Sequence, residues 1–215
     1  DRLVVSKGHA GPAVYATLAH RGYFPESELY TLNKIHTNLP SHCDMNKTIG
    51  IDMTTGSLGQ GLSCGVGMAL ASRIKQDNSF TYVILGDGEL QEGQNFEAMG
   101  FAGVQKLDHL IVFLDNNGMQ IDDYTNKLVY AEKYQEKFES FGFDTVVIDG
   151  HNFDQIISAI ERAKKLSGMP HAIIMNTIKG KGISFIENAK LSNHSMPITA
   201  EQLKMGLKEL NLEDN

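Results

Sequence analysis

The chain has 215 residues, a length that suits one domain with a sizeable hydrophobic core. Hydrophobic residues make up 41% and charged residues 21%, as in ordinary globular proteins, and the net charge of −7 argues against general nucleic-acid binding, which needs an electropositive face. No apolar run approaches the roughly 20 residues that span a bilayer, so we expect no membrane segment and a cytoplasmic location.

The two cysteines, Cys43 and Cys64, lack the spacing of a metal site. A single pair does not suit a disulfide framework, and it fits a reducing compartment. The chain opens abruptly on "DRLVVSKGH" without a secretory type of amino terminus, so we expect an upstream segment to be missing.

The first 75 residues predict two helices, over 10–21 and 61–74. The second is rich in small residues ("GLSCGVGMALASRI"), which permit close backbone approach to another helix or to a ligand. Between the helices, residues 37–61 form a long irregular stretch dense in Gly, Thr, Asn and His. Long loops inside compact domains are often functional.

From residue 80 onward, apolar β-branched runs alternate with helical patterns. Continuous apolar strands separated by helices predict an α/β fold with a parallel sheet sandwiched by helices. One of these helices follows Asp154, which we expect to cap it, and a short helix with an acidic end is expected after Pro197. The expected strands are 80–85, 109–114, 145–148 and 171–175, and the other expected helices are 95–104 and 131–141.

Polar side chains follow two of these strands directly. Asp87 comes after the first strand and Asn117 after the second, and ligands gather at the carboxyl ends of parallel strands. Gly86, Gly88 and Gly118 allow the backbone to approach a bulky anion. Carboxylate, amide and carbonyl oxygens suit Mg²⁺ or Ca²⁺, and a helix beginning after Gly88 would add a partial positive charge. The pattern predicts a metal-bridged diphosphate site.

A plainer interpretation exists for each motif taken alone. Gly-Asp-Gly is an ordinary strand-to-helix turn in which Asp87 caps the helix, and Asn-Asn-Gly is usually a turn. The combination of strand, Gly-Asp-Gly, helix, strand and Asn-Asn-Gly favours the site. Its two candidate ligands, Asp87 and Asn117, lie 117 − 87 = 30 positions apart.

Gly86-Asp87-Gly88 with Asn116-Asn117 resembles the diphosphate-binding motif of thiamine diphosphate (ThDP) enzymes, and most of the chain resembles the amino-terminal half of a transketolase. The matching stretches occur in the family's order, which makes the resemblance specific. They are "DRLVVSKGHA", "GIDMTTGSLGQGLSCGVGMALASRIK", "GDGELQEGQNFEA", "DNNGMQIDD" and "TIKGKGIS".

The resemblance implies a role for residues at the matching positions. The metal ligands would be the side chains of Asp87 and Asn117 and the carbonyl of Met119, while Asn116 would be structural. His9, His42 and His194 would be the active-site histidines. The cofactor would be bound by His9, Gly56, Leu58, Gly86, Asp87, Gly88, Glu92 and Asn117.

The sequence departs from the family around two of the histidines. Ser41-His42-Cys43 stands where the family has Gly-His-Pro, and "SNHSMP" around His194 replaces the usual Trp-His-Gly. Glu92 and Glu97 match acidic residues of a proton-linked network that crosses the family's subunit interface. Other polar residues are expected to be structural or solvated, with His151 in a turn or cap and Glu89, Asp122 and Asp123 as surface charges.

The activity implied is that of a transketolase, which uses ThDP and Mg²⁺ (or Ca²⁺) to move a two-carbon ketol unit from a ketose or its phosphate to an aldose or its phosphate. We expect residues 1–215 to form a single diphosphate-binding domain that lacks the family's first helices. The pyrimidine-binding domain, with its activating glutamate, and the C-terminal domain would belong to a partner chain. The chain would be the N-terminal subunit of a split transketolase, inactive alone, in a dimer or heterotetramer.

Several alternatives keep the cofactor and change the reaction: dihydroxyacetone synthase-like, sulfosugar-cleaving, deoxyxylulose-phosphate synthase-like and 2-oxoacid dehydrogenase enzymes. "SKGH" with "TTGSLGQG" favours the transketolase branch over the last two. A non-catalytic cofactor-binding module is a further alternative. A nicotinamide-dependent dehydrogenase needs G-x-G-x-x-G after its first strand, and the turn at Gly86 lacks the last glycine of that motif.

Overall fold

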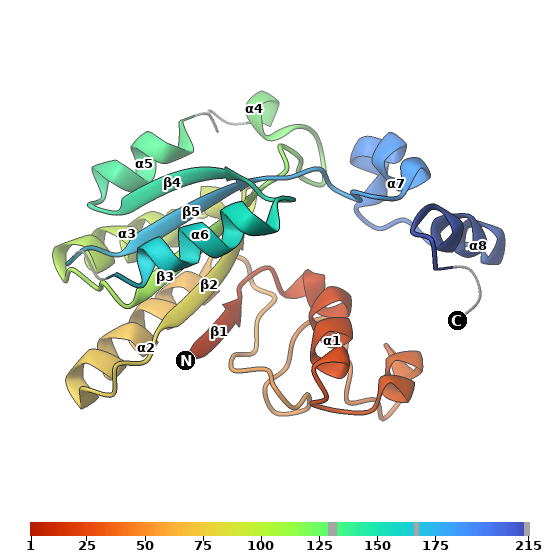
Figure 1. Cartoon of the computed structure of the whole chain (residues 1–215), viewed down its shortest axis with the longest axis horizontal. Helices are drawn as coiled ribbons and strands as arrows, with labels where there is room; N and C mark the ends of the chain where they lie inside the picture. Colours follow the sequence, from red (N-terminus) through yellow and green to blue (C-terminus); the bar gives the residue numbers. More distant parts are fainter. Residues whose placement is uncertain (129–132, 166–167, 213–215) are drawn as a thin grey trace.

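A computed structural model describes residues 1–128, 133–165 and 168–212. Its centre is a parallel five-stranded sheet with the strand order β1-β2-β3-β5-β4, and helices pack on both faces (Figure 1). The predicted α/β class with a helix-covered parallel sheet is therefore confirmed. The strands are β1 (Arg2–Val5), β2 (Thr81–Gly86), β3 (Leu110–Asn116), β4 (Asp144–Asp149) and β5 (His171–Asn176).

The register of the sheet brings the carboxyl ends of its central strands to one edge. Gly86 at the end of β2 pairs with Asp115 of β3, and Asn116 pairs with Asn176 at the end of β5. The loops that leave β2, β3 and β5 consequently begin side by side. This edge is where ligands bind in open parallel sheets.

The sheet's two faces pack against different helices (Figure 1). On one face, Val83 of β2 and Val112 of β3 lie in a large buried cluster with three helices: α2 (Gln60–Lys75), α3 (Gly93–Val104) and α5 (Tyr134–Ser140). On the other face, Ile111 and Ile173 pack against α6 (Phe153–Ala163). Successive side chains of a strand point to opposite faces, so continuous apolar strands serve both layers.

The four expected strands lie within two residues of observed ones, and β1 is a fifth strand that the sequence pattern does not predict. It is only four residues long, and only Val4 and Val5 of it are buried. Its amino-terminal half therefore lacks the pattern of a buried strand. The expected helix over 131–141 begins outside the described residues and is observed from Tyr134 to Ser140.

One expectation about helices is corrected and another is extended. Asp154 does not cap α6: the cap is Asn152, whose side-chain oxygen accepts the Gln155 N–H at 3.1 Å. The small residues of α2 allow a close approach to the sheet as well as to α3. A Cβ added at Gly65 would run into the Val83 side chain, and one at Gly61 would run into Ser6. The expectation of another helix is met by α3, and the sheet is a further neighbour that it did not include.

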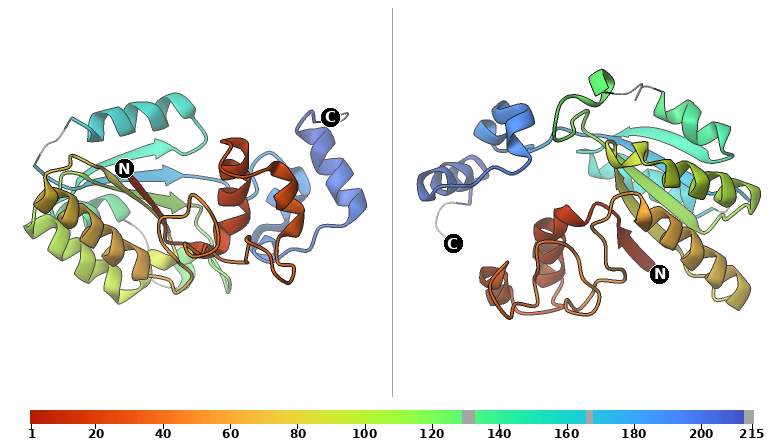
Figure 2. Two further views of the ribbon diagram at one scale, coloured as in Figure 1. Left: turned by 90° about the horizontal axis from the view of Figure 1, so that it is seen from below. Right: turned by 180° about the vertical axis from the view of Figure 1, so that it is seen from behind.

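An amino-terminal layer lies beside the β1 edge of the sheet (Figure 2). It contains α1 (Gly11–His20), a 3₁₀ helix over Glu26–Thr31, and the expected irregular stretch, which runs without a helix or strand to residue 59. A small separate core, which includes Tyr15, Phe24 and Cys43, holds this layer together. The loop that it supports reaches the carboxyl edge of the sheet.

The carboxyl-terminal segment lies to one side of the sheet (Figure 1). It contains α7 (Ser184–Ala189) and α8 (Ala200–Glu209). The short helix α4 (Thr125–Leu128) belongs to another segment, between β3 and α5. Thr199 begins α8 with a capping box, as expected for a helix after Pro197.

Cys43 and Cys64 are both free. Among the described residues, no helix combines the length and apolar character needed to cross a membrane.

Candidate functional site

Asp87 lies buried at the end of β2, with only 2% of its surface exposed. Its two carboxylate oxygens accept different backbone N–H groups: Oδ1 accepts from Gly88 at 2.7 Å and Oδ2 from Gly118 at 2.6 Å. The residue caps no helix: the 3₁₀ helix over Glu89–Gln91 has Gly88 as its N-cap, and α3 begins at Gly93. A helix therefore does begin directly after Gly88, as expected, but it is a single 3₁₀ turn. Asp87 instead joins the loops after β2 and β3.

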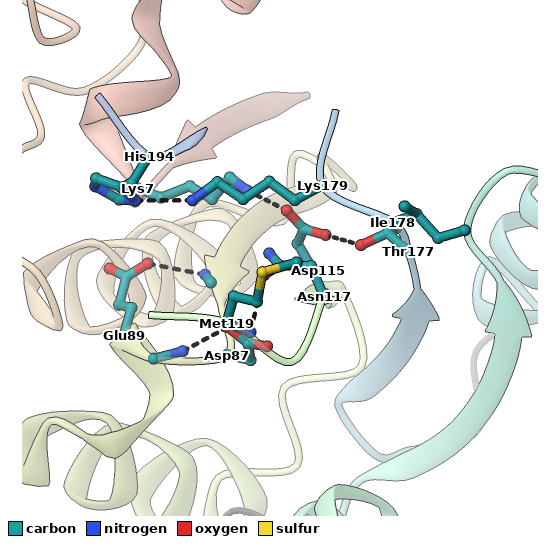
Figure 3. A network of polar contacts seen from close by, with 12 residues as sticks. Lys7, Asp87, Glu89, Asp115, Asn117, Met119, Thr177, Ile178, Lys179 and His194 are labelled. Carbon is teal, nitrogen blue, oxygen red and sulfur yellow. Dashed lines mark hydrogen bonds and ion pairs between the residues drawn. The ribbon is translucent and has the colours of Figure 1, made fainter. Parts of the chain in front are cut away.

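Asn117 and Met119 lie in the loop after β3, close to Asp87 (Figure 3). The loop turns at Gly118, whose φ of +73° is a left-handed conformation that favours glycine. The Asn117 side-chain oxygen accepts the Met119 N–H at 3.1 Å, which fixes the amide. We call Asp87, Asn117 and Met119 the oxygen cluster. All three line one cavity of about 720 Å³ at the carboxyl edge of the sheet.

The electrostatics of Asp87 suit a bound cation. Burial raises the pKa of Asp87 to about 6, and the neighbouring Asp115 adds to the rise, whereas the N–H groups of Gly118 and Gly88 and the charge of Lys7 oppose it. A buried carboxylate with a raised pKa is one whose charge is poorly compensated. A divalent cation held by carboxylate, amide and carbonyl oxygens would supply that compensation.

An ion pair that we did not expect lies above the oxygen cluster (Figure 3). Lys7, just after β1, donates to Asp115 of β3, and the Thr177 hydroxyl after β5 donates to the other oxygen of the same carboxylate. Burial would raise the pKa of Asp115, but Lys7 and these hydrogen bonds hold it below its usual value. Lys7 belongs to the "SKGH" match, but no pattern in the sequence links it to Asp115.

The three predicted histidines all line the cavity. The rings of His9 and His194, from opposite ends of the chain, lie 5.4 Å apart between centroids. Lys179 Nζ lies 2.8 Å from His194 Nδ1. Burial lowers the pKa of His9 to about 4, with help from the positive charges of Lys7 and Lys179 and from the neighbouring histidines, and burial and both lysines also lower the pKa of His194.

The remaining predicted cofactor contacts line the same cavity: Gly56, Leu58, Gly86, Gly88 and Glu92. Gly56 packs against the ring of His42, where an added Cβ would lie 3.2 Å from Cδ2. Glu92 and Glu97 are both exposed, and Glu97 does not line the cavity. The structure thus gathers every predicted cofactor, metal and histidine position around one cavity and leaves Glu97 on the surface of α3.

Residues expected to be structural or solvated divide into different groups. Glu89 is not a surface charge: it is 3% exposed and hydrogen-bonded on both carboxylate oxygens. Asp123 pairs with Lys127 at 3.3 Å, whereas Asp122 is exposed at the cavity rim. His151 has a structural contact in the loop after β4, where its Nε2 accepts the Ile178 N–H at 2.7 Å. Asn116, expected to be structural, donates to Asn176 at 2.8 Å.

The cavity combines the requirements for a metal-bound anion. One end carries the oxygen cluster, and no cluster of three His, Cys, Asp or Glu side chains suited to a metal occurs among the described residues. A mixed carboxylate, amide and carbonyl set favours a hard cation such as Mg²⁺ or Ca²⁺ over zinc. Lys7 and Lys179 add positive charge along the wall, and Gly86 and Gly88 expose backbone to the space.

Comparison with known proteins places the chain in a family. The family model described as "Transketolase, thiamine diphosphate binding domain" matches residues 1–215. The chain is 55% identical over 213 residues to the 6-deoxy-6-sulfo-D-fructose transketolase subunit SqwG of Clostridium sp. (strain MSTE9), covering 99% of this chain and 77% of that protein. It is 37% identical over 210 residues to an apulose-4-phosphate transketolase subunit from Actinobacillus succinogenes, covering 98% and 75%.

A solved structure gives the same result. The transketolase of Campylobacter jejuni superimposes with a TM-score of 0.93 at 33% identity, over 100% of this chain and 35% of that one. The chain therefore spans about a third of that transketolase, but three-quarters of the two relatives named as subunits. The fold, the match to the family model and the identity to these relatives agree: the chain belongs to the transketolase family and corresponds to its thiamine diphosphate-binding domain.

Proposed function

We propose that the chain is a ThDP- and Mg²⁺-dependent transketolase subunit, with Ca²⁺ able to replace Mg²⁺, that moves a two-carbon ketol unit from a ketose to an aldose. The observation that carries the proposal is the single cavity in which the oxygen cluster and three histidines meet. When bound, ThDP would supply a nucleophilic carbon that adds to a ketone and an electron sink for breaking the adjacent carbon–carbon bond.

The residues of the chain would hold the cofactor at two ends. Asp87, Asn117 and the Met119 carbonyl would hold the cation, and Lys7 and Lys179 would offset the negative charge of the diphosphate. The loop that carries Gly56 and Leu58 would contact the rings. The glycines at 86 and 88 leave room for the diphosphate, because side chains there would point into or crowd this end of the cavity.

The histidines would exchange protons with the substrate. With a pKa of about 4, His9 is neutral near pH 7, so its ring can accept a hydrogen bond from the substrate. The Lys179 ammonium group can only donate hydrogen bonds, so it donates to His194 Nδ1. The neutral His194 ring then carries its own proton on Nε2. His42, on the loop opposite, would contact the same substrate.

We propose that a separate partner chain supplies the pyrimidine-binding domain. The reason is that two relatives are themselves named as subunits, and this chain matches about three-quarters of the length of each. The complete enzyme would be a dimer of such pairs in the cytoplasm. A non-catalytic cofactor-binding module would bind ThDP yet show no turnover with any partner.

The second candidate for the donor substrate, after a sugar phosphate, is a sulfosugar. It is favoured by the 55% identity to a protein named as a 6-deoxy-6-sulfo-D-fructose transketolase subunit. Sulfonate and phosphate are both tetrahedral anions, but they differ in charge and in hydrogen-bonding capacity. Comparison of kcat/KM for 6-deoxy-6-sulfofructose and fructose 6-phosphate, with one aldose phosphate acceptor and the partner chain present, decides between them.

The cofactor assignment is tested by calorimetry with ThDP and Mg²⁺ on the wild-type chain and on Asp87→Ala. We expect Asp87→Ala to lose nearly all metal-dependent affinity, because the one carboxylate of the oxygen cluster is gone. Asp154→Ala, on the exposed first turn of α6 and outside the cavity, is the matched control and should bind as wild type. Undiminished affinity in Asp87→Ala would exclude Asp87 as a ligand of the metal and contradict the proposed site.

A further inference from the structure

Glu89 is a buried carboxylate to which the proposed cofactor site gives no role. It follows the Gly86–Gly88 turn and is 3% exposed. Its own backbone carbonyl accepts a hydrogen bond of 2.6 Å from the side chain of Asn95, which is fully buried in α3. The residue is thereby fixed at both its backbone and its side chain.

The Glu89 carboxylate joins three segments that are distant in the sequence. Oε1 accepts from the hydroxyl of Ser6, at the end of β1, and from the N–H of Gly59 at 3.0 Å. Oε2 accepts from the N–H of Gly86, at the end of β2, at 3.1 Å. Figure 3 shows the carboxylate beside the oxygen cluster.

The position of Gly59 makes this contact significant. Gly59 has a φ of +86° and directly precedes α2, so it ends the loop that carries Gly56 and Leu58. That loop has no helix or strand of its own, and it needs an external anchor to keep one position. Glu89 supplies one on the same carboxylate that holds the Gly86 turn.

We propose that Glu89 is a positioning residue that fixes the loop ending at Gly59 against the turn at Gly86–Gly88. The inference rests on the proposed function, in which the loop contacts the rings of ThDP and the turn contacts its diphosphate. The buried carboxylate then helps to set the distance between the two ends of the cofactor site, together with the hydrogen bonds that Thr55 of the same loop donates to Val5 and Cys43. Glu89 also lines the cavity, but both of its carboxylate oxygens are bound to these segments, and it acts through them.

Glu89→Gln is the sharpest variant, because it keeps the shape and removes one acceptor. The two backbone N–H groups bind different carboxylate oxygens. A glutamine has one side-chain oxygen, so whichever way its amide turns, either Gly59 or Gly86 faces an NH₂ group. Ser6→Ala removes only the hydroxyl donor and leaves both backbone contacts. Glu161→Gln, exposed on α6, is the matched control.

Two probes separate the ends of the site: ThDP with Mg²⁺, which needs both segments, and inorganic pyrophosphate with Mg²⁺, which needs only the oxygen cluster and its turn. For Glu89→Gln we expect calorimetry to show ThDP affinity falling about tenfold, as for a loop in its binding position one-tenth of the time. Pyrophosphate affinity should fall by no more than ThDP affinity, because pyrophosphate depends on the turn alone. Ser6→Ala should lose less ThDP affinity than Glu89→Gln.

Unchanged ThDP affinity in folded Glu89→Gln, or a larger loss for pyrophosphate than for ThDP, would overturn the inference. If the variant does not fold, amide hydrogen exchange in the wild-type chain decides: the Gly59 and Gly86 N–H groups should be protected, and rapid exchange at both would refute the anchor. If the wild type binds neither probe with its partner chain present, the proposed function is wrong, and the same exchange measurement still shows whether Glu89 holds the two segments.

Discussion

The Lys179 side chain lies between the oxygen cluster and the two histidines His9 and His194. Its own pKa is lowered, chiefly by burial and then by the charge of Lys7, although Asp87 and Asp115 oppose the change. Lys7 is paired with Asp115, whereas Lys179 contacts a histidine ring. Lys179 is thus a half-buried cation whose charge acts directly on the proposed proton-transfer groups.

We expect Lys179→Met to raise the pKa of His194 and, by less, that of His9. A positive neighbour disfavours the protonated ring, so its removal lets both rings take up protons at higher pH. NMR titration of the histidine ring signals measures the change. Lys165→Met, on an exposed lysine outside the cavity, should leave both midpoints in place. Unshifted midpoints in a folded Lys179→Met would contradict the assigned electrostatics.

At the scale of elements, α2 sets how closely the helical layer approaches the sheet. Gly65 faces Val83, a fully buried residue in β2, and an added methyl group there would overlap the valine side chain. Gly67, two residues further along the same helix, faces open space. The helix therefore contains one glycine that packing requires and one that it does not.

We expect Gly65→Ala to destabilise the chain by about 1–3 kcal/mol, because overpacking exceeds the gain in helix propensity. Gly67→Ala should instead stabilise it by about 0.5–1 kcal/mol, the usual difference between alanine and glycine in a helix. Denaturant unfolding of both variants measures the free energies. Equal effects from the two substitutions would show that α2 does not lie this close to β2.

The elements also show what the sequence could and could not predict. Four of the strands, the adjacency of Asp87 and Asn117 and the meeting of the histidines around one cavity followed from patterns and family resemblance. The burial of Glu89 did not, because a glutamate after Gly-Asp-Gly has the pattern of a surface charge, and its donors Ser6 and Gly59 are distant in the sequence. Contacts that depend on tertiary placement leave no periodic signal.

Across the whole molecule, the cavity shares the acidic character of the chain. The net charge is −7, and the cavity wall carries Lys7 and Lys179 beside the carboxylates of Asp87, Glu89, Glu92, Asp115 and Asp122. The cavity therefore suits a small anionic cofactor only together with a cation that offsets these carboxylates. It does not provide the extended basic face that nucleic acids require.

We expect the purified chain to show no transketolase turnover alone and to gain it when a pyrimidine-binding partner chain is added. The reason is that this chain corresponds to 35% of a complete transketolase. Turnover as a function of the partner-to-chain ratio should saturate near equal amounts, and a mass measurement on the mixture reports the assembly. Asp87→Ala is the control that should still associate but not turn over. Full turnover by the chain alone would exclude the split arrangement.

The strand order also determines when each part of the sheet can form during synthesis on the ribosome. β1, β2 and β3 are neighbours in the sheet, so the oxygen cluster at the ends of β2 and β3 can form as soon as β3 has emerged. β4 emerges next, but its neighbour is β5, which inserts between β3 and β4. Until β5 arrives, the edge of β3 stays open, a state that chaperones protect from pairing with other chains.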